Sequence, residues 1–348
     1  MKKLIALVTA CCVGAVGLAG CGNQSTSTTS GDKALKIVCT NFSGYDFARQ
    51  IAGDKAEVTM LLKPGAEAHS YEPTPEDIKA IQSSDLFVYT GGDADEWVEH
   101  VLESIDTNKH KAFKMMDAVS LREEEIVEGM VHEHHHEEDA HEEHAHHEHA
   151  HEEDAHHEHE HEEHAHHEHE HAHEMDEHVW TSPVNAIAIV KAMSDNIISL
   201  DAADAEYFKK NTETYVKELQ DLDKEFRDVI DHAKRKEIIV GDRFPFLYFA
   251  KEYGLSYYAA FPGCSKDTGS NPATVAFLID KVKADNIPVV FHIEMSNEQM
   301  SKSIAEATGA KNMLLNAIHN VTAEQFEKGV TYIDLMKENV KALKEALN

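Results

Sequence analysis

Residues 35–62, LKIVCTNFSGYDFARQIAGDKAEVTMLL, set the class of the fold. The apolar run Leu35–Thr40 predicts a buried strand, Tyr45–Ala52 predicts a helix, and Ala56–Leu62 predicts a second strand. Strands that alternate with helices are typical of an α/β layer built on a parallel sheet. This stretch therefore predicts the start of an α/β domain.

The same alternation continues to about residue 120 and begins again after residue 235. The further strands that we expect are Asp85–Tyr89, Glu237–Val240, Ser256–Ala260, Pro288–His292 and Lys311–Leu315. The further helices are Thr74–Ser83, Trp97–Ile105, Phe246–Tyr253, Pro272–Asp285, Asn297–Thr308 and Thr331–Leu347. We therefore expect two α/β lobes with mostly parallel sheets, one from residues 35–131 and 174–201 and the other from residues 235–348.

A long helical pattern over residues 202–234 separates the two lobes. Its apolar residues recur at steps of seven, four and three, and neither proline nor glycine interrupts them. The apolar positions are Phe208, Tyr215, Leu219, Leu222, Phe226 and Val229. At 1.5 Å per residue, a helix of roughly 30 residues spans about 45 Å, which suits a rigid strut between the lobes. A coiled-coil dimer seam is the alternative, although we expect a monomer.

Residues 132–173 hold 20 of the 27 histidines of the chain and include three tandem decads, EEHAHHEHAH, EEDAHHEHEH and EEHAHHEHEH, over 142–171. This tract offers only alanines to bury, so we expect a disordered insert. Imidazole suits Zn, Cu, Ni and Co, and the tract therefore indicates auxiliary metal collection. Its collecting residues include His134, His135, His136, His146, His147, His156, His157, His166 and His167.

Residues 1–20 are typical of a bacterial secretory signal, with a basic start, a short apolar stretch and small residues before Cys21. The sequence Leu18-Ala19-Gly20-Cys21 resembles the lipobox of bacterial lipoproteins, in which the cysteine is acylated. We therefore expect lipidation of Cys21, a flexible tether over residues 21–34, and a location at the outer face of the bacterial plasma membrane.

Charge and cysteine content exclude other classes of protein. Removal of residues 1–20 takes away two lysines and no acids, so the mature chain is more acidic than the full sequence. Residues 133–174 alone carry 17 of the 64 Asp and Glu residues and have no Lys or Arg. An acidic chain without clustered Lys and Arg is not expected to bind nucleic acid. Beyond Cys21 only Cys39 and Cys264 remain, which is not a disulfide framework.

Two histidines lie in short segments that could fix an imidazole. His69 belongs to the loop GAEAHSYEPTPED, which runs from Gly65 to Asp77 between an expected strand and an expected helix, where α/β sheets bind their ligands. His178 begins His178–Pro183, HVWTSP, directly before an apolar helix. A surface or outer-layer residue is the alternative for His69, and the last histidine of the tract is the alternative for His178.

These two motifs, with AEYFKKNTETYVKELQDLD at residues 205–223, resemble the zinc and manganese receptor lipoproteins of bacterial ABC importers, the ZnuA/TroA-type group. The likeness covers about residues 35–348 apart from the insert. It implies two lobes joined by one long helix, with a metal ion held between them and delivered to an ABC permease for import. In that family one histidine from each motif binds the metal, which implies His69 and His178.

The resemblance also implies two ligands from the second lobe. An ungapped count places the third at Arg243, whose guanidinium stays protonated, so we take Asp242 as the ligand, with Cys264 as an alternative. The fourth position falls on His319, where the family has a carboxylate. For His292 and Glu294 we expect a polar pair between the lobes rather than ligands.

The resulting site of three histidines and one aspartate favours zinc over manganese, while nickel and cobalt fit the same ligand types. We expect a receptor that does no chemistry of its own. A surface lipoprotein that sequesters zinc or mediates adhesion without a transporter is one alternative. A zinc hydrolase is another, although outside the His/Glu tract no His-Glu-x-x-His motif lies on an expected helix.

Overall fold

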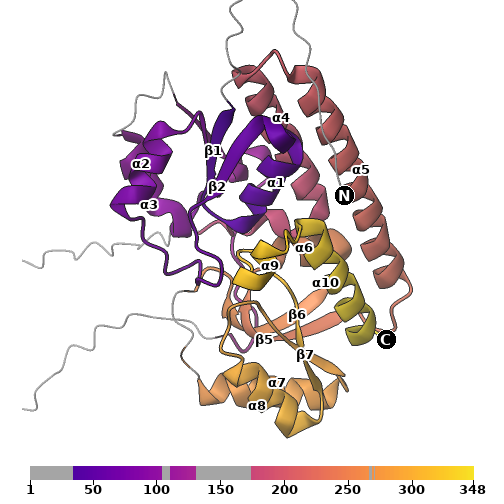
Figure 1. The fold of residues 1–348 in the computed structure, drawn as a ribbon. Coiled ribbons are helices and arrows are strands. Elements are labelled where there is room, and N and C mark those ends of the chain that lie inside the picture. The colour runs from indigo at the N-terminus through magenta and orange to yellow at the C-terminus, as the bar shows by residue number, and fades with distance from the viewer. Residues whose placement is uncertain (1–33, 104–109, 131–173, 266–268, 270) are drawn as a thin grey trace, which may run out of the picture. The chain divides into compact units, whose positions relative to one another are not determined.

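The computed structural model describes residues 34–348 except 104–109, 131–173, 266–268 and 270 (Figure 1). The expected signal peptide, Cys21, the tether and the His/Glu insert lie outside the described residues, and what we expect of them stays a prediction. Within the described residues, no helix has the length and apolar character needed to cross a membrane.

The first sheet has four parallel strands in the order β2-β1-β3-β4. Their bounds are β1 Leu35–Cys39, β2 Ala56–Met60, β3 Leu86–Tyr89 and β4 Lys111–Lys114. The sequence predicts the first three strands but not β4. Only Phe113 of this edge strand is buried, so its sequence lacks the apolar run that marks the other strands.

The second sheet repeats this order as β6-β5-β7-β8, again with all strands parallel. Its strands are β5 Glu237–Phe244, β6 Ser256–Pro262, β7 Val289–His292 and β8 Lys311–Leu314. Strand β5 continues four residues beyond the predicted end, with an irregular register between Val240 and Arg243. Asp242 and Arg243 therefore belong to this strand and not to a loop after it.

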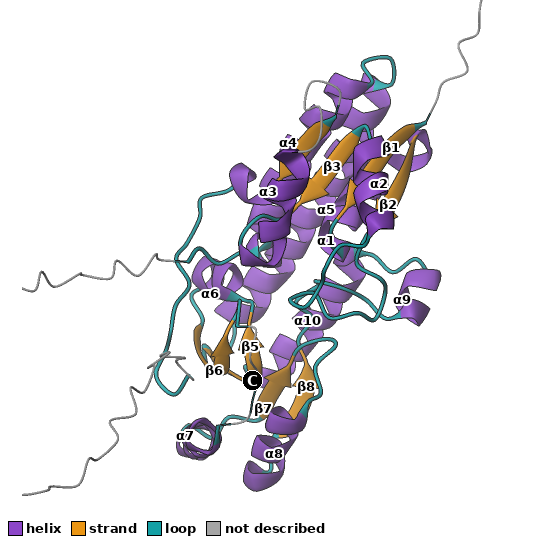
Figure 2. Ribbon diagram, turned by 90° about the vertical axis from the view of Figure 1, so that its left-hand side faces the viewer, coloured by secondary structure: helices purple, strands orange, loops and turns teal. Residues whose placement is uncertain are grey.

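Helices cover both faces of each sheet, and the alternation of buried residues follows from this. In β1, Ile37 and Cys39 pack with the core that includes α1 (Phe42–Ala52) and α5 (Ala205–Asp231). Val38 packs on the opposite face with α2 (Pro75–Ser83) and α3 (Glu96–Glu103). The second sheet divides in the same way, with α6 (Leu247–Tyr253) and α10 (Tyr332–Ala346) on one face and α7 (Pro272–Ala284) and α8 (Gln299–Thr308) on the other. Figure 2 shows α7 and α8 side by side on their face.

The helices around the first sheet are α1 Phe42–Ala52, α2 Pro75–Ser83, α3 Glu96–Glu103 and α4 Pro183–Leu200. Those of the second are α6 Leu247–Tyr253, α7 Pro272–Ala284, α8 Gln299–Thr308 and α10 Tyr332–Ala346, while the short helix α9, Ala323–Glu327, contacts Tyr45 of α1 through Phe326. The five-residue α9 has no buried residue and escapes prediction from the sequence.

Helix α5, Ala205–Asp231, joins the two sheets as predicted (Figure 1). Near its middle, Tyr215 donates its hydroxyl proton to Asp46 of α1 at 3.2 Å. Two turns later Asp223 accepts a hydrogen bond from the hydroxyl of Tyr253 in α6 at 2.8 Å. The apolar stripe of α5 is buried against other helices of this same chain, so it needs no coiled-coil partner. The last buried residue of the stripe is Ile230 and not Val229 as predicted.

Both sheets lie in one compact unit, residues Ala34–Asn348. The fold class of two α/β lobes joined by one long helix is thus confirmed, whereas the lobe boundaries at residues 201 and 235 stay predictions.

Candidate metal site

In the first sheet the next two strands of the chain, β2 and β3, lie on opposite sides of β1. In the second sheet β6 and β7 lie on opposite sides of β5 in the same way. The order in which strands are added therefore reverses at β1 and at β5. Ligands of open α/β sheets bind just past the carboxyl ends of strands at such points. His69 lies in the loop after β2, and His319 lies in the loop after β8. His178 directly precedes the short 3-10 turn Val179–Thr181 that leads into α4.

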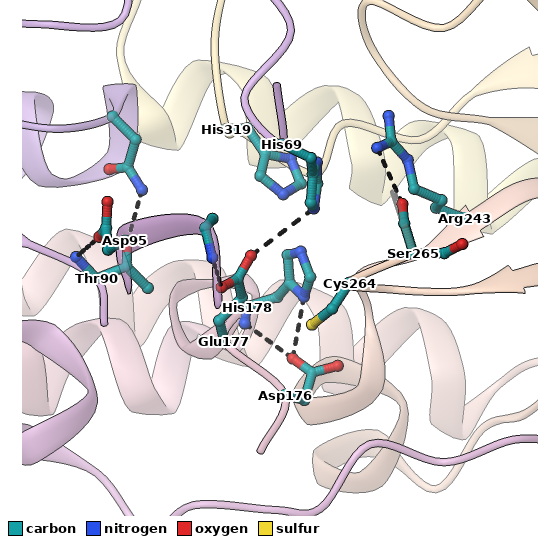
Figure 3. A network of polar contacts seen from close by, with 12 residues as sticks. His69, Thr90, Asp95, Asp176, Glu177, His178, Arg243, Cys264, Ser265 and His319 are labelled. Atoms are coloured by element: carbon teal, nitrogen blue, oxygen red, sulfur yellow. Dashed lines mark hydrogen bonds and ion pairs between the residues drawn. The ribbon is translucent and has the colours of Figure 1, made fainter. Parts of the chain in front are cut away.

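These three histidines meet at one place, which Figure 3 shows between the two lobes. One ring nitrogen from each lies within 4.8 Å of the other two. The ring centroids are 5.7 Å apart for His69 and His178, 5.1 Å for His69 and His319, and 4.8 Å for His178 and His319. Three of the four predicted ligands therefore lie together although they are widely separated in the sequence.

Each of the three imidazoles has a carboxylate at Nδ1. The partner of His69 is Glu67 at 3.0 Å, that of His178 is Asp176 at 3.1 Å, and that of His319 is Glu294 at 3.3 Å. A carboxylate accepts the proton of Nδ1, which leaves the lone pair of Nε2 free for a metal.

All three Nε2 atoms are buried and have no hydrogen-bond partner. A buried polar atom without a partner is costly and rare, and here three such atoms face one centre. Carboxylate–histidine pairs of this kind orient the ligands in zinc sites. The chemistry of the donor set thus fits a transition metal that accepts nitrogen ligands.

The electrostatic environment favours the neutral imidazoles that a metal needs. Burial lowers the pKa of His178 well below its ordinary value, and the nearby charge of Arg243, with that of His69 whenever His69 is protonated, adds to this effect. Burial also lowers the pKa values of His69 and His319, although hydrogen bonds to Glu67 and Glu294 oppose it. These histidines are therefore ready to bind metal without first losing a proton.

The loop that carries His319 is held in a strained conformation. Ile318 has a φ of 64°, which is unfavourable for a β-branched residue, and it is buried. Glu294 accepts hydrogen bonds from the backbone amides on either side of Ile318, from Ala317 at 2.6 Å and from His319 at 2.8 Å. Glu294 therefore fixes both the strained backbone and the ring of His319.

Contacts between the lobes hold the histidine loops in register. Asn320 donates from Nδ2 to the carbonyls of Lys63 and Ala66, both at 2.8 Å, just before His69. Trp180 donates from its indole to the carbonyl of Ala317 at 2.7 Å. The loops of His69, His178 and His319 are thus tied to one another without any metal contact.

Asp242 and Cys264, the alternatives for the remaining ligand, are not members of the three-histidine group. Asp242 accepts from the backbone amide of Arg243 at 2.9 Å and lines a separate cavity of about 240 Å³. Cys264 lies near Asp176 in Figure 3, and burial raises the pKa of its thiol. Among the described residues, neither side chain joins the cluster, and the choice of Asp242 finds no support in this geometry.

Arg243 lies beside the cluster in a role that the sequence does not suggest. Its Nη2 lies 2.9 Å from Glu67 Oε1, the same oxygen that accepts from His69. Burial opposes ionisation of Glu67, but the hydrogen bond from His69 and the charge of Arg243 outweigh it and hold the pKa of Glu67 below its usual range. Arg243 thus links the second lobe to a partner of His69.

Several carboxylates of the site escape prediction from the sequence. Glu67 and Asp176 each stand two residues before a histidine that they orient, and this shared spacing is a signal that could have been used. Glu294 does not pair with His292 as expected, because His292 instead contacts Asn312 at 2.9 Å.

Glu177 precedes His178 and is also buried. Burial raises the pKa of Asp176 to about 7 and that of Glu177 to about 8, and neighbouring acids add to the shift at Glu177. The site thus contains a further acidic side chain, next to a histidine, that no motif indicates.

The family described as zinc-uptake complex component A, periplasmic (ZnuA), matches residues 37–346. The chain is 36% identical over 333 residues to the high-affinity zinc uptake system protein ZnuA of Bacillus subtilis (strain 168), and the match covers 95% of this chain and 93% of that protein. It is 33% identical over 347 residues to the zinc-binding lipoprotein AdcA of Streptococcus pneumoniae, and the match covers 99% of this chain and 61% of AdcA.

The fold is similar to that of solved structures. The Zn(II)-bound ZnuA-like domain of Streptococcus pneumoniae AdcA has a TM-score of 0.68 and 28% sequence identity, with 90% of this chain and 99% of that domain covered. The fold of this chain therefore has a counterpart that was solved with zinc bound.

Proposed function

Because the chain belongs to the ZnuA family of zinc-uptake components, we propose that it captures Zn(II) outside the cytoplasm and delivers it to an ABC permease for import. The observation that carries this proposal is the convergence of three buried Nε2 atoms, each on an imidazole that a carboxylate orients. In this role the protein binds and releases an ion and changes no covalent bond.

We propose His69, His178 and His319 as the ligands that carry the zinc. Zinc takes nitrogen ligands at about 2.0–2.1 Å, which separates neighbouring ligand atoms of a tetrahedron by about 3.3–3.4 Å. The nitrogen atoms here lie within 4.8 Å of one another, so small rotations of the side chains suffice to reach that geometry. A nitrogen-rich donor set favours zinc over manganese, which prefers carboxylate oxygen.

Release of the metal requires that the lobes be disturbed. The contacts of Asn320 and Trp180 hold loops from both lobes around the site without using the metal. A permease that separates these loops would withdraw His319 from His69 and weaken the zinc site at once. The His/Glu tract at 132–173 would collect metal weakly, and acylated Cys21 would anchor the protein to the outer face of the plasma membrane.

Zinc accumulation in the bacterium that encodes this chain tests the proposal. A strain without the gene is grown in zinc-depleted medium and complemented with the parent chain, with His319→Ala or with His292→Ala as the matched control. We expect the parent and the control to restore zinc accumulation and His319→Ala to leave it at the level of the deletion strain. Restored accumulation with His319→Ala would overturn the proposed site.

The same experiment separates import from the alternative of sequestration or adhesion. If the chain is a receptor for import, deletion of its gene lowers cellular zinc uptake. A chain that binds zinc in solution but whose deletion leaves uptake unchanged would instead be a sequestering lipoprotein.

A further inference from the structure

Three histidines leave one position of a tetrahedral zinc site open. Structural zinc sites are closed by a fourth protein ligand, whereas catalytic sites leave that position to water. A receptor that must hold its cargo without chemistry has no use for an activated water. The question is therefore which side chain among the described residues could close the site.

Like Asp242 and Cys264, Glu177 is not a member of the three-histidine group, but its carboxylate is buried beside one of the unpartnered Nε2 atoms of that group. Its Oε1 lies 3.8 Å from Nε2 of His69, and the carboxylate and this ring are both buried. A separation of 3.8 Å is too long for a hydrogen bond. It is close to the distance of about 3.3–3.6 Å that separates two ligand atoms of a tetrahedral zinc site with bond lengths of about 2.0–2.2 Å.

The backbone around Glu177 fixes the position of its side chain. Its other oxygen, Oε2, accepts a hydrogen bond from the backbone amide of Ala94 at 3.0 Å. Gly92 leaves the space that the side chain occupies, because a Cβ at that position would lie 2.7 Å from Oε2. One oxygen is thus held by the backbone while the other is turned toward the histidines, as Figure 3 shows.

There is also room for the small movement that binding requires. A cavity of about 30 Å³, space for about one water molecule, lies beside Glu177 and His319. The carboxylate is therefore not locked against its neighbours on that side. A shift of a few tenths of an ångström would bring Oε1 to the distance at which it shares an ion with Nε2 of His69.

We infer that Glu177 supplies the fourth zinc ligand through Oε1 and closes a site of three nitrogens and one oxygen. This inference rests on the proposed function and deepens it. It replaces Asp242 and Cys264 in the ligand set, and it takes the fourth ligand from the segment that holds His178 instead of from the second lobe. One negative charge then joins three neutral imidazoles around a doubly charged ion.

The structure of the zinc-loaded chain without residues 132–173, determined with anomalous scattering at the zinc edge, tests this directly. The expected result is zinc bound to three Nε2 atoms and to Oε1 of Glu177, with the Zn–O distance at about 2.0–2.2 Å. Water, Asp242 or the sulfur of Cys264 in the fourth position would overturn the inference. This experiment needs no substitution, so a folding defect cannot obscure it.

Zinc affinity, measured by competition with a chromophoric chelator, gives a second test. Because removal of an outer-layer partner costs about 10–100-fold in metal affinity, we expect Glu177→Gln to cost more than about 100-fold. The matched control is Glu124→Gln, another largely buried glutamate, which accepts from the backbone amide of Cys264 at 2.8 Å and should keep the parent affinity.

His178→Ala separates failure of this inference from failure of the proposed function. If His178→Ala loses zinc while Glu177→Gln binds it as the parent does, the inference about Glu177 is wrong and the zinc site stands. If His178→Ala also binds zinc as the parent does, the proposed site itself is wrong.

Discussion

The substitution Glu294→Gln tests in one variant how the strained loop is stabilised and how the zinc ligand His319 is positioned. Glu294 uses two oxygens to accept three N–H groups, from the amides of Ala317 and His319 and from the ring of His319. Glutamine offers only one accepting oxygen. If that oxygen keeps the contacts with His319, the amide group of glutamine turns its own N–H toward the N–H of Ala317.

The magnitude follows from these contacts. A largely buried amide without an acceptor costs about 1–3 kcal/mol, so the free energy of unfolding of the metal-free protein should fall by about that amount. The ring of His319 also loses its charged partner, and such outer-layer partners are worth about 10–100-fold in metal affinity. This factor corresponds to about 1.4–2.7 kcal/mol of zinc binding.

Two assays on the chain without residues 132–173 measure these effects, urea unfolding of the metal-free protein and competition for zinc with a chromophoric chelator. The matched control is Glu298→Gln, which lies four residues away and contacts Lys302 and Asn312 at the surface. Because exposed ion pairs contribute about 0–1 kcal/mol, this control should change little. Zinc affinity of Glu294→Gln within about twofold of the parent would refute our account of how His319 is positioned.

Three further predictions concern stability. Burial raises the pKa of Asp95 to about 6 from an ordinary 3.8. The folded protein therefore binds more protons there than the unfolded chain, so this group lowers stability by up to about 3 kcal/mol as pH rises from 4 to 6. Asp95→Asn should flatten that part of the unfolding profile of the metal-free protein, and an unchanged slope would contradict the shift. Phe226→Ala should cost about 3–5 kcal/mol in urea unfolding, because its fully buried ring packs edge-on to another aromatic ring at 4.8 Å, whereas the half-buried Val229→Ala should cost far less. Free zinc at 100 times its dissociation constant should stabilise the chain by about 2.7 kcal/mol in thermal unfolding, and the chelator EDTA or His178→Ala should abolish this gain; a gain that persists in His178→Ala would place the zinc elsewhere.

The fold was predictable because its signals are local. Apolar runs mark the strands that are buried on both faces, and an uninterrupted stripe of apolar residues marks α5. Strand β4 was missed because its two central residues stand between two lysines, and helix α9 was missed because it is only five residues long. His69 and His178 were reached through motifs that stand beside predictable elements, whereas His319 was reached only through the position that the family resemblance implies.

The rest of the site depends on three-dimensional contacts that spacing does not encode. The irregular register within β5 places Arg243 against Glu67, which no count along the sequence can anticipate. Glu294 reaches His319 only because β7 and β8 are neighbours in the sheet. The sequence does not single out Glu177 as part of the site, because it follows an acidic tract in which glutamates are frequent.

A calorimetric zinc titration of the chain without residues 132–173 tests the central claim most directly. We claim that one tight site lies between the lobes at His69, His178 and His319, while the tract contributes only weak sites. The account predicts a stoichiometry of one zinc ion per chain, with high affinity, that is lost when His178 is replaced by alanine. Loss of tight binding with the tract itself, while His178→Ala in the full-length chain keeps it, would contradict the account.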